Sequence, residues 1–305
     1  MVAQISQDVT LNRNFYIGGS DIAAVLGKSR YKTPYRLWCE KTGKIENTVS
    51  NLEAVEMGTK LEQFVADLFS EKANKSVRRA PRAYRHSEYP YMVAHVDRLI
   101  TGTDELLECK TCSAYKLDEW QNAIPQEYVL QVIWYLGITG RKRGWIACLI
   151  GGQKFDYKVI DFDRELFDLM VKKAVEFWDM VQNDTPPLIM PDDDTTLAEV
   201  YKDHSGNLVE AQEFNERAAY LQELKMHRDE INKEIKEIET ELKAKIADNE
   251  GVLTDKYKIT WKKSVRTLFD KDSFQNEHRD LFEKYLLTSS YRTLRITNRK
   301  DVLNV

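Results

Sequence analysis

The chain has 305 residues, of which 42% are hydrophobic and 31% are charged, and its formal net charge is −4. This length suits two domains, and the hydrophobic fraction is sufficient to bury a core. No apolar run approaches the ~18 residues that a membrane span requires, and the N-terminus lacks the basic-then-apolar pattern of a signal peptide. We therefore expect no membrane association and a cytoplasmic location.

Charge and cysteine content narrow the possible classes further. A mildly acidic chain is not expected to coat nucleic acid generally. Residues 251–305 nevertheless hold 12 Lys and Arg against 7 Asp and Glu, which indicates an anionic partner for that end. The cysteines are irregularly spaced, so we expect thiols and not a disulfide framework.

Hydrophobic periodicity predicts an α/β (α+β) architecture for the first 190 residues. The motif Gly18-Gly19-Ser20-Asp21 opens a short helix that continues to Leu26. The elements expected after it are helices over 33–42 and 52–74, strands over 77–85, 90–100 and 105–112, a helix over 125–138, strands over 143–150 and 154–161, and a helix over 163–183. This order predicts a mixed central sheet flanked by helices.

A Pro- and Asp-rich stretch over 184–194 marks the predicted domain boundary. We expect domains over 1–190 and 191–305. The second would hold a helical arm over 208–248 with an imperfect heptad of Leu and Ile. A small α/β end over 251–305 would follow, with a strand over 257–265, a helix over 270–286 and a strand over 291–297.

The segment 96–110, VDRLITGTDELLECK, carries the chemistry. It is typical of a strand, a glycine-centred turn and a second strand. Alternate side chains of a strand share a face, so Glu108 and Lys110 should point the same way while Cys109 points away. The hairpin can bring Asp97 alongside them. A charged pair on an otherwise apolar strand is costly unless it is used or paired, although an ordinary surface hairpin is the alternative.

Two carboxylates and a lysine in this layout are typical of a PD-(D/E)xK nuclease site. Mg²⁺ takes hard oxygen ligands and keeps several waters, so Asp97, Glu108 and the Cys109 carbonyl are sufficient ligands. Lys110 would hold the attacking water and stabilise negative charge. Glu62, one helical turn after Gly58, is a fourth candidate. We expect two Mg²⁺ ions, for which Mn²⁺ can substitute.

Residues 13–182 resemble the YqaJ-type viral recombinase and phage lambda exonuclease family. The resemblance rests on motifs in a fixed order: 17–27 (IGGSDIAAVLG), 29–38 (SRYKTPYRLW), 58–62 (GTKLE), 95–98 (HVDR), 108–110 (ECK) and 128–131 (YVLQ). It implies a restriction-endonuclease-like core, with Asp97 and Glu108 binding metal, Lys110 catalytic and Glu62 an accessory acid.

The resemblance also implies an activity and partners. A family member would be a Mg²⁺-dependent exonuclease, phage or prophage encoded, that degrades one strand of duplex DNA from its 5′ end. Its 3′ overhang would be loaded with a single-strand annealing protein, and the enzyme would form a ring trimer around DNA. The 5′-phosphate would be bound by Arg13, Ser20 and Gln131, with His95 where the lambda enzyme has Ser.

Other interpretations remain open from the sequence. Ser20 and Asp21 can simply cap the helix they open. An endonuclease on the same fold (nicking, restriction-like or structure-specific) would cut closed circles. A non-catalytic DNA-end-binding scaffold for recombination would bind DNA without cutting it. The role of residues 191–305 stays undefined.

Overall fold

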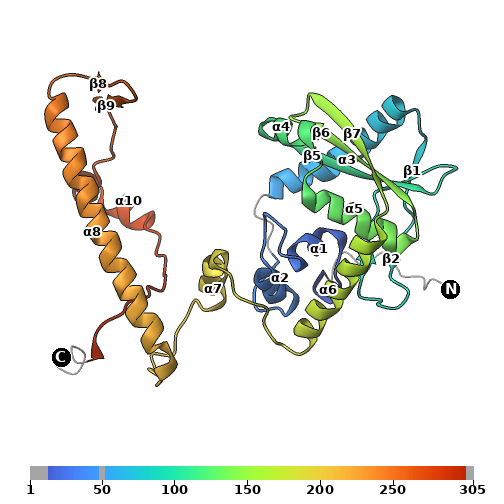
Figure 1. Ribbon diagram of the computed structural model, residues 1–305, viewed down its shortest axis with the longest axis horizontal. Helices are drawn as coiled ribbons and strands as arrows, with labels where there is room; N and C mark the ends of the chain where they lie inside the picture. The colour runs from blue at the N-terminus through green and yellow to red at the C-terminus, as the bar shows by residue number, and fades with distance from the viewer. Residues whose placement is uncertain (1–12, 48–51, 300–305) are drawn as a thin grey trace. The chain divides into compact units, whose positions relative to one another are not determined.

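The structure is a computed structural model that describes residues 13–47 and 52–299 (Figure 1). It contains two compact units, with the division between Tyr201 and Lys202. None of the described helices is both long and apolar enough to cross a membrane.

The first unit is built on a five-stranded mixed sheet, which confirms the predicted fold class. The strand order is β1 (Val77–Arg79), β4 (Arg98–Ile100), β5 (Glu105–Cys112), β6 (Arg143–Ile150) and β7 (Lys154–Asp161). Strands β5 and β6 pair in parallel, and the other neighbouring pairs are antiparallel. The chemically important strand β5 therefore lies at the centre of the sheet.

Parallel pairing of β5 and β6 requires a crossover, which helices α4 (Leu117–Asn122) and α5 (Gln126–Thr139) provide. Helix α5 is mostly apolar and buried. Its Trp134 is fully buried, and the indole Nε1 donates to the Val93 carbonyl at 3.0 Å. The helix ends at Gly140, whose φ of 69° is the left-handed conformation that glycine adopts readily.

Helices cover both faces of the sheet. One face carries α3 (Leu52–Ala73), and the other carries α5, α1 (Gly19–Val25), α2 (Pro34–Lys41) and α6 (Arg164–Gln182) (Figure 1). Successive side chains of β5 point to opposite faces of the sheet, so the strand contributes to the hydrophobic core on both faces. Leu106 belongs to the cluster that includes α5, whereas Leu107 packs with Phe69 of α3.

Two of the predicted strands are interrupted. The strand expected over 77–85 forms as β1 and, separately, β2 (Tyr84–Arg85), because Pro81 between them has no N–H for a ladder. The strand expected over 90–100 forms as β3 (Val93–Ala94) and β4. Strands β2 and β3 pair with each other outside the main sheet, so residues 95–97 leave the ladder and Asp97 lies at a bend.

The boundary after residue 190 also differs from the structure, because residues 191–200 pack against the first unit. A short 3-10 turn (Pro191–Asp193) and helix α7 (Asp194–Val200) follow the proline-rich stretch. Asp193 is fully buried and accepts a hydrogen bond from Thr33 at the start of α2. Arg36 forms an ion pair with Glu199 at 3.0 Å. These polar contacts hold the segment to α2.

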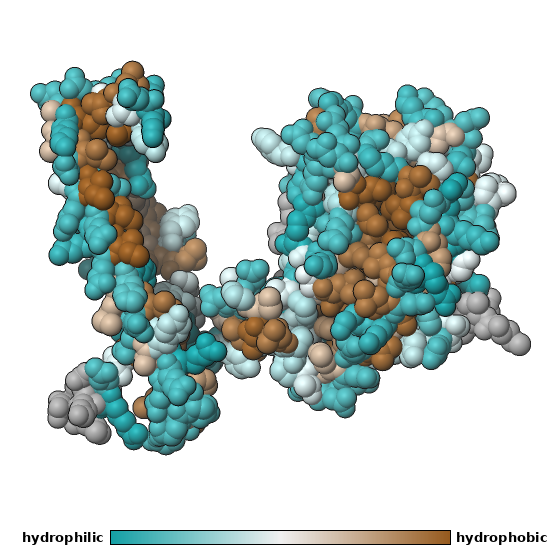
Figure 2. Space-filling model, viewed as in Figure 1, coloured by the Kyte–Doolittle hydropathy of each residue, from teal (hydrophilic) through white to brown (hydrophobic). Residues whose placement is uncertain are grey.

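The second unit contains the predicted helical arm, α8 (Asn215–Ile246), and little regular structure after it. The elements after α8 are β8 (Gly251–Leu253), β9 (Lys258–Thr260), α9 (Lys271–Glu277) and α10 (Arg279–Lys284). The helix expected over 270–286 is thus broken at His278, and residues 291–297 form no strand. Ile231, Ile235 and Ile238 lie exposed in an apolar line along α8 (Figure 2).

The buried alternation of β5 predicts that Leu106→Ala destabilises the first unit by about 2–5 kcal/mol, because it leaves a cavity. Leu188→Ala, at an exposed position, should cost less than about 0.5 kcal/mol. Urea unfolding followed by tryptophan fluorescence measures both, since five of the six tryptophans lie in this unit. Equal losses for the two variants would contradict the assignment of β5 to the core.

Candidate active site

Strand β5 places Glu108 and Lys110 on one face, as the sequence predicts. The Lys110 Nζ lies 2.6 Å from Glu108 Oε1. Gln131 of α5 donates from Nε2 to the same carboxylate oxygen at 2.6 Å. Cys109 lies in the core cluster of the opposite face, against α3. Glu108 is only 3% exposed, so this charged pair is inside the protein and not on a surface hairpin.

Asp97 reaches the same place from the bend before β4. Its Oδ2 accepts a hydrogen bond from the Cys109 backbone N–H at 2.8 Å, which ties the bend to β5 beside Glu108. Burial, and then the negative charge of Glu108, raise the pKa of Asp97 well above its usual range, while Lys110 acts in the opposite direction. The structure therefore brings together two carboxylates and one ammonium, and the carboxylates repel each other.

The donor set fits a hard divalent cation. Glu108 Oε2 is buried and has no hydrogen-bond partner among the described residues, so its lone pairs are not engaged by a donor there. No group of three or more His, Cys, Asp or Glu side chains within the described ranges is arranged to hold a metal. Asp97 and Glu108 would therefore need oxygen ligands of other kinds, such as water or the predicted Cys109 carbonyl, and Mg²⁺ accepts both.

Glu62 approaches the site from α3 but is engaged by a partner that the sequence analysis missed. Its Oε1 lies 2.5 Å from Nη1 of Arg98, which is 2% exposed. Arg98 also donates to the Asp97 carbonyl at 2.8 Å and to Gln63 at 3.1 Å. Arg98 thus positions both Glu62 and the Asp97 backbone. The sequence feature that could have identified Arg98 is its position directly after Asp97 in the HVDR motif.

Arg13 and Ser20 are in direct contact. The Arg13 Nη2 donates to Ser20 Oγ at 2.7 Å and lies 3.7 Å from Asp21 Oδ1. Asp21 accepts the Gly18 N–H at 3.1 Å, a capping contact, and forms an ion pair with Lys41 at 2.9 Å. The predicted capping function of Asp21 is thus observed, while Ser20 makes no cap hydrogen bond of its own.

Buried Lys41 is a second residue that the sequence analysis did not single out. Besides Asp21, its Nζ donates to the carbonyls of Arg13 at 2.5 Å and Tyr16 at 2.6 Å. Two carbonyls of the segment before α1 and the Asp21 carboxylate in the first turn of α1 therefore converge on one ammonium. This arrangement fixes the backbone of Arg13, although Arg13 lies close to the beginning of the described chain.

A close approach of α1 to α5 joins this region to the carboxylates. A Cβ on Gly19 would lie 2.4 Å from Cε1 of Tyr135 and 3.0 Å from Cγ of Gln131, so only glycine fits there. Gln131 also donates to the Tyr135 hydroxyl at 2.7 Å. Gln131 therefore contacts Glu108 on one side and the start of α1, next to Ser20, on the other.

His95 is the remaining predicted residue, and it lies on a different cavity from Arg13 and Ser20. It lines a cavity of about 320 Å³ together with Asp97, and its Nε2 is buried without a hydrogen-bond partner in the described chain. Its ring centroid lies 5.4 Å from that of Tyr16. Burial, followed by the charges of Arg13 and Arg85, lowers the pKa of His95, so the ring is neutral at neutral pH.

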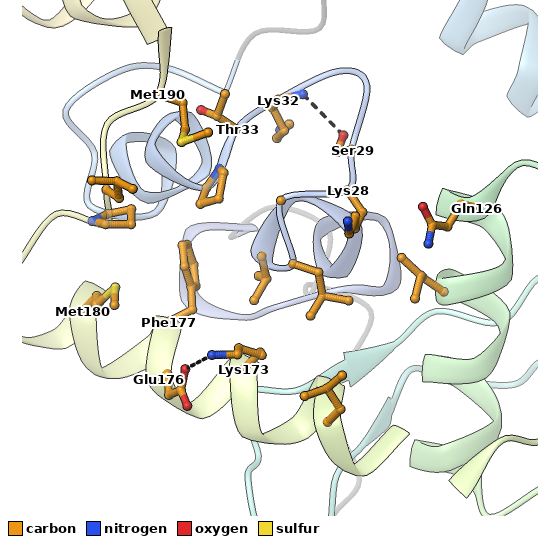
Figure 3. A pocket seen from close by; sticks show the side chains of 18 of the residues that line it. Lys28, Ser29, Lys32, Thr33, Gln126, Lys173, Glu176, Phe177, Met180 and Met190 are labelled. Atoms are coloured by element: carbon orange, nitrogen blue, oxygen red, sulfur yellow. Dashed lines mark hydrogen bonds and ion pairs between the residues drawn. The ribbon is translucent and has the colours of Figure 1, made fainter. Parts of the chain in front are cut away.

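Another cavity, of about 790 Å³, lies between the start of α2 and helix α6 and is largely apolar (Figure 3). Phe177, Met180 and Met190 line it, and the Lys173–Glu176 ion pair lies at its edge. None of the predicted site residues borders this cavity. The chemistry is therefore assigned to the Asp97–Glu108 cluster despite the larger volume here.

The fold of the first unit is similar to that of an alkaline exonuclease whose crystal structures are known. The crystal structures of an alkaline exonuclease (LHK-Exo) from Laribacter hongkongensis and of LHK-Exo in complex with dAMP both align with a TM-score of 0.50. They share 18% and 19% sequence identity with this chain, and each alignment covers 59% of this chain and 94% of the other. The likeness establishes the fold.

Sequence comparison establishes the family. Residues 10–142 match the YqaJ-like viral recombinase domain. The uncharacterized protein YqaJ of Bacillus subtilis (strain 168) is 35% identical over 302 residues, which cover 95% of this chain and 94% of that protein. The chain belongs to the YqaJ-like viral recombinase family, as its motifs predicted.

The raised pKa of Asp97 predicts a stability cost that depends on pH. The folded protein holds the Asp97 proton more tightly than the unfolded chain, so stability falls as pH rises from about 4 through the folded pKa. In EDTA, Asp97→Asn should therefore have a higher urea midpoint than wild type at pH 8, and the difference should shrink toward pH 4. Asp168→Asn on the surface of α6 is the control; identical pH profiles for Asp97→Asn and wild type would refute the prediction.

Proposed function

We propose that this protein is a metal-dependent 5′–3′ exodeoxyribonuclease that degrades one strand of linear duplex DNA. Its product would carry 3′ overhangs suited to phage-type recombination by single-strand annealing. Family membership and fold support an exonuclease acting on DNA. The polarity, the metal and the product are inferred from the family resemblance together with the site chemistry.

The observation that carries the proposal is the cluster of buried Glu108 with half-buried Asp97 and Lys110. Two carboxylates without enough hydrogen-bond donors are unfavourable inside a protein unless a cation neutralises them. The unpartnered Glu108 Oε2 supports this argument independently of the sequence motif. A stable structural role alone would favour pairing every carboxylate oxygen with a donor.

The protein's own groups have distinct roles in the proposed hydrolysis. Burial alone would lower the pKa of Lys110, but the charges of Glu108 and Asp97 raise it above its usual value. Lys110 therefore remains an ammonium, which suits holding a water and stabilising charge on the phosphate better than accepting a proton. Gln131 holds the Glu108 carboxylate in place by a hydrogen bond. Arg98, which is paired with Glu62, holds the Asp97 backbone through its carbonyl.

The residues that would hold Mg²⁺ are Asp97, Glu108 and the Cys109 carbonyl, with Glu62 as an accessory acid. When bound, one or two Mg²⁺ ions, or Mn²⁺, supply a more acidic water and neutralise charge on the attacking and leaving oxygens. Arg13, Ser20 and Gln131 would bind the 5′-phosphate, with His95 close to the scissile position. The Arg13–Ser20 contact of 2.7 Å supports a shared role for these two.

The proposal extends to partners. An annealing protein would receive the 3′ overhang, and three copies of the chain would enclose the duplex, as the family resemblance implies. The enzyme would act in the cytoplasm of a bacterial host cell from a phage or prophage gene. Among the described residues of the second unit there is no chemical cluster comparable to Asp97–Glu108–Lys110, and we infer binding or assembly for this unit.

Lys110→Ala should lower hydrolysis of linear duplex by about 100- to 1000-fold, because one preorganised charge contact to the reacting phosphate is lost. Asp97→Ala should abolish it, as should EDTA until Mg²⁺ is restored. Release of acid-soluble nucleotides measures the rate. Lys154→Ala, on an exposed position of β7, is the matched control. Full activity of Asp97→Ala would overturn the proposed site, and DNA binding without hydrolysis by wild type would favour the scaffold alternative.

End specificity separates the exonuclease from the endonuclease. Linear duplex with a 5′-phosphate should be degraded faster than duplex with a 5′-hydroxyl, and closed circles should survive. Arg13→Ala and Ser20→Ala should reduce the preference for the 5′-phosphate to about one, because each removes a phosphate contact. Strand-specific 5′ and 3′ labels report the polarity; cleavage of closed circles would favour the endonuclease instead.

A further inference from the structure

The eight-residue segment 78–85, which begins within β1, contains four arginines: Arg78, Arg79, Arg82 and Arg85. None of them belongs to the predicted catalytic or 5′-phosphate residues. Arg79 and Arg82 are exposed. Within the part of the chain that the structure describes, neither side chain makes a hydrogen bond or ion pair, so both guanidinium groups are available to a ligand.

The sheet places these two arginines beside the catalytic cluster. Arg79 lies opposite Arg98 in the β1–β4 register, and the Ala80 N–H donates to the Asp97 carbonyl at 3.4 Å. Arg79 and Arg82 consequently line the cavity of about 320 Å³ that Asp97 and His95 also border.

The charge balance inside this cavity favours an anion near the arginines. Of the two acids on its wall, Glu62 is neutralised by its ion pair with Arg98. The negative charge of Asp97 is offset by the nearby Lys110. His95 also borders the cavity, and its Nε2 is buried without a hydrogen-bond partner in the described chain.

Basic residues at a neighbouring cavity offer a contrast. A cavity of about 730 Å³ is lined by Arg13, Ser20 and further basic residues, but not by Arg79 or Arg82. Several of those basic residues are already neutralised: Arg30 by Glu127 and Glu119, and Arg36 by Glu199. On the cavity that Asp97 borders, the cations without an ion-pair partner in the described chain are therefore Arg79 and Arg82. They line a different cavity from the Arg13–Ser20 pair.

We propose that Arg79 and Arg82 bind an internal backbone phosphate of the DNA, so that they hold the strand next to the scissile bond. Guanidinium groups match phosphate oxygens with two parallel hydrogen bonds. This inference rests on the proposed function, because it assumes a DNA substrate at the Asp97 cluster. Its ligand is distinct from the terminal 5′-phosphate assigned to Arg13 and Ser20.

The test is equilibrium binding of end-labelled duplex DNA to the full chain in EDTA, at several salt concentrations and with either a 5′-phosphate or a 5′-hydroxyl. Arg79→Gln should weaken binding by about 10-fold, as expected for one lost charged hydrogen-bonding contact. Arg79→Gln/Arg82→Gln should weaken binding further and reduce the slope of log affinity against log salt by about 2. Both end chemistries should be affected equally. In Mg²⁺, the variants should raise KM more than they lower kcat.

Arg78→Gln is the matched control. Arg78 precedes Arg79 on the same short strand, so its side chain points to the other face, and it does not line the cavity. The Arg78→Gln variant loses one positive charge, as Arg79→Gln does, but it should bind DNA as wild type does. Thermal unfolding of all variants checks that the fold is retained.

Each possible result bears on the inference. Wild-type binding by Arg79→Gln/Arg82→Gln, or an equal loss with Arg78→Gln, overturns it while the proposed nuclease function stands. A loss confined to 5′-phosphorylated DNA overturns it in favour of a terminal phosphate. If wild type neither binds nor degrades DNA, the proposed function fails and this inference fails with it.

Discussion

The site depends on one electrostatic conflict: two carboxylates, half-buried Asp97 and buried Glu108, are held close together. Burial and mutual repulsion raise the pKa of Asp97, and one oxygen of Glu108 lacks any partner in the described chain. Lys110 offsets only part of this charge. The folded chain therefore maintains an arrangement that a cation would stabilise, as expected where function and stability compete.

Several parts of the fold position the two carboxylates and the residues around them. Parallel pairing with β6 puts Glu108 in the sheet centre, and the crossover that this pairing requires supplies α5 with Gln131. Gly19 lets α1 approach α5 closely enough to bring Ser20 near the same glutamine. Lys41 then fixes the segment that carries Arg13. Positions far apart in sequence become one region through these close contacts.

The sequence allowed the elements of the first unit and the shared face of Glu108 and Lys110 to be predicted, because both follow from local periodicity. It could not reveal the interruption of the strands before β4, since that depends on β2 and β3 pairing outside the main sheet. It likewise missed Arg98 and Lys41. Both are buried cations whose partners become neighbours only after folding, and no spacing rule marks such a pair.

In the second unit, the long helix could be predicted from the sequence but the short elements after it could not. A heptad pattern correctly predicted a long helix. Of the two strands expected after it, the one over 257–265 forms only as β9, the one over 291–297 does not form, and the expected helix breaks at His278. Tertiary packing normally decides such marginal elements, and here the residues after α8 are mostly exposed.

Net charge also says little about where this chain can meet DNA. The chain carries −4 overall, yet what a phosphate encounters is the local balance within about one Debye length, ~8–10 Å. Around Arg30 and Arg36, carboxylates cancel the positive charge, whereas the described chain provides no carboxylate partner for the side chains of Arg79 and Arg82. An acidic protein can thus present a basic surface of a few residues, provided that its other cations are paired internally. The distribution of ion pairs, and not the total charge, therefore identifies the part of this surface best suited to an anionic polymer.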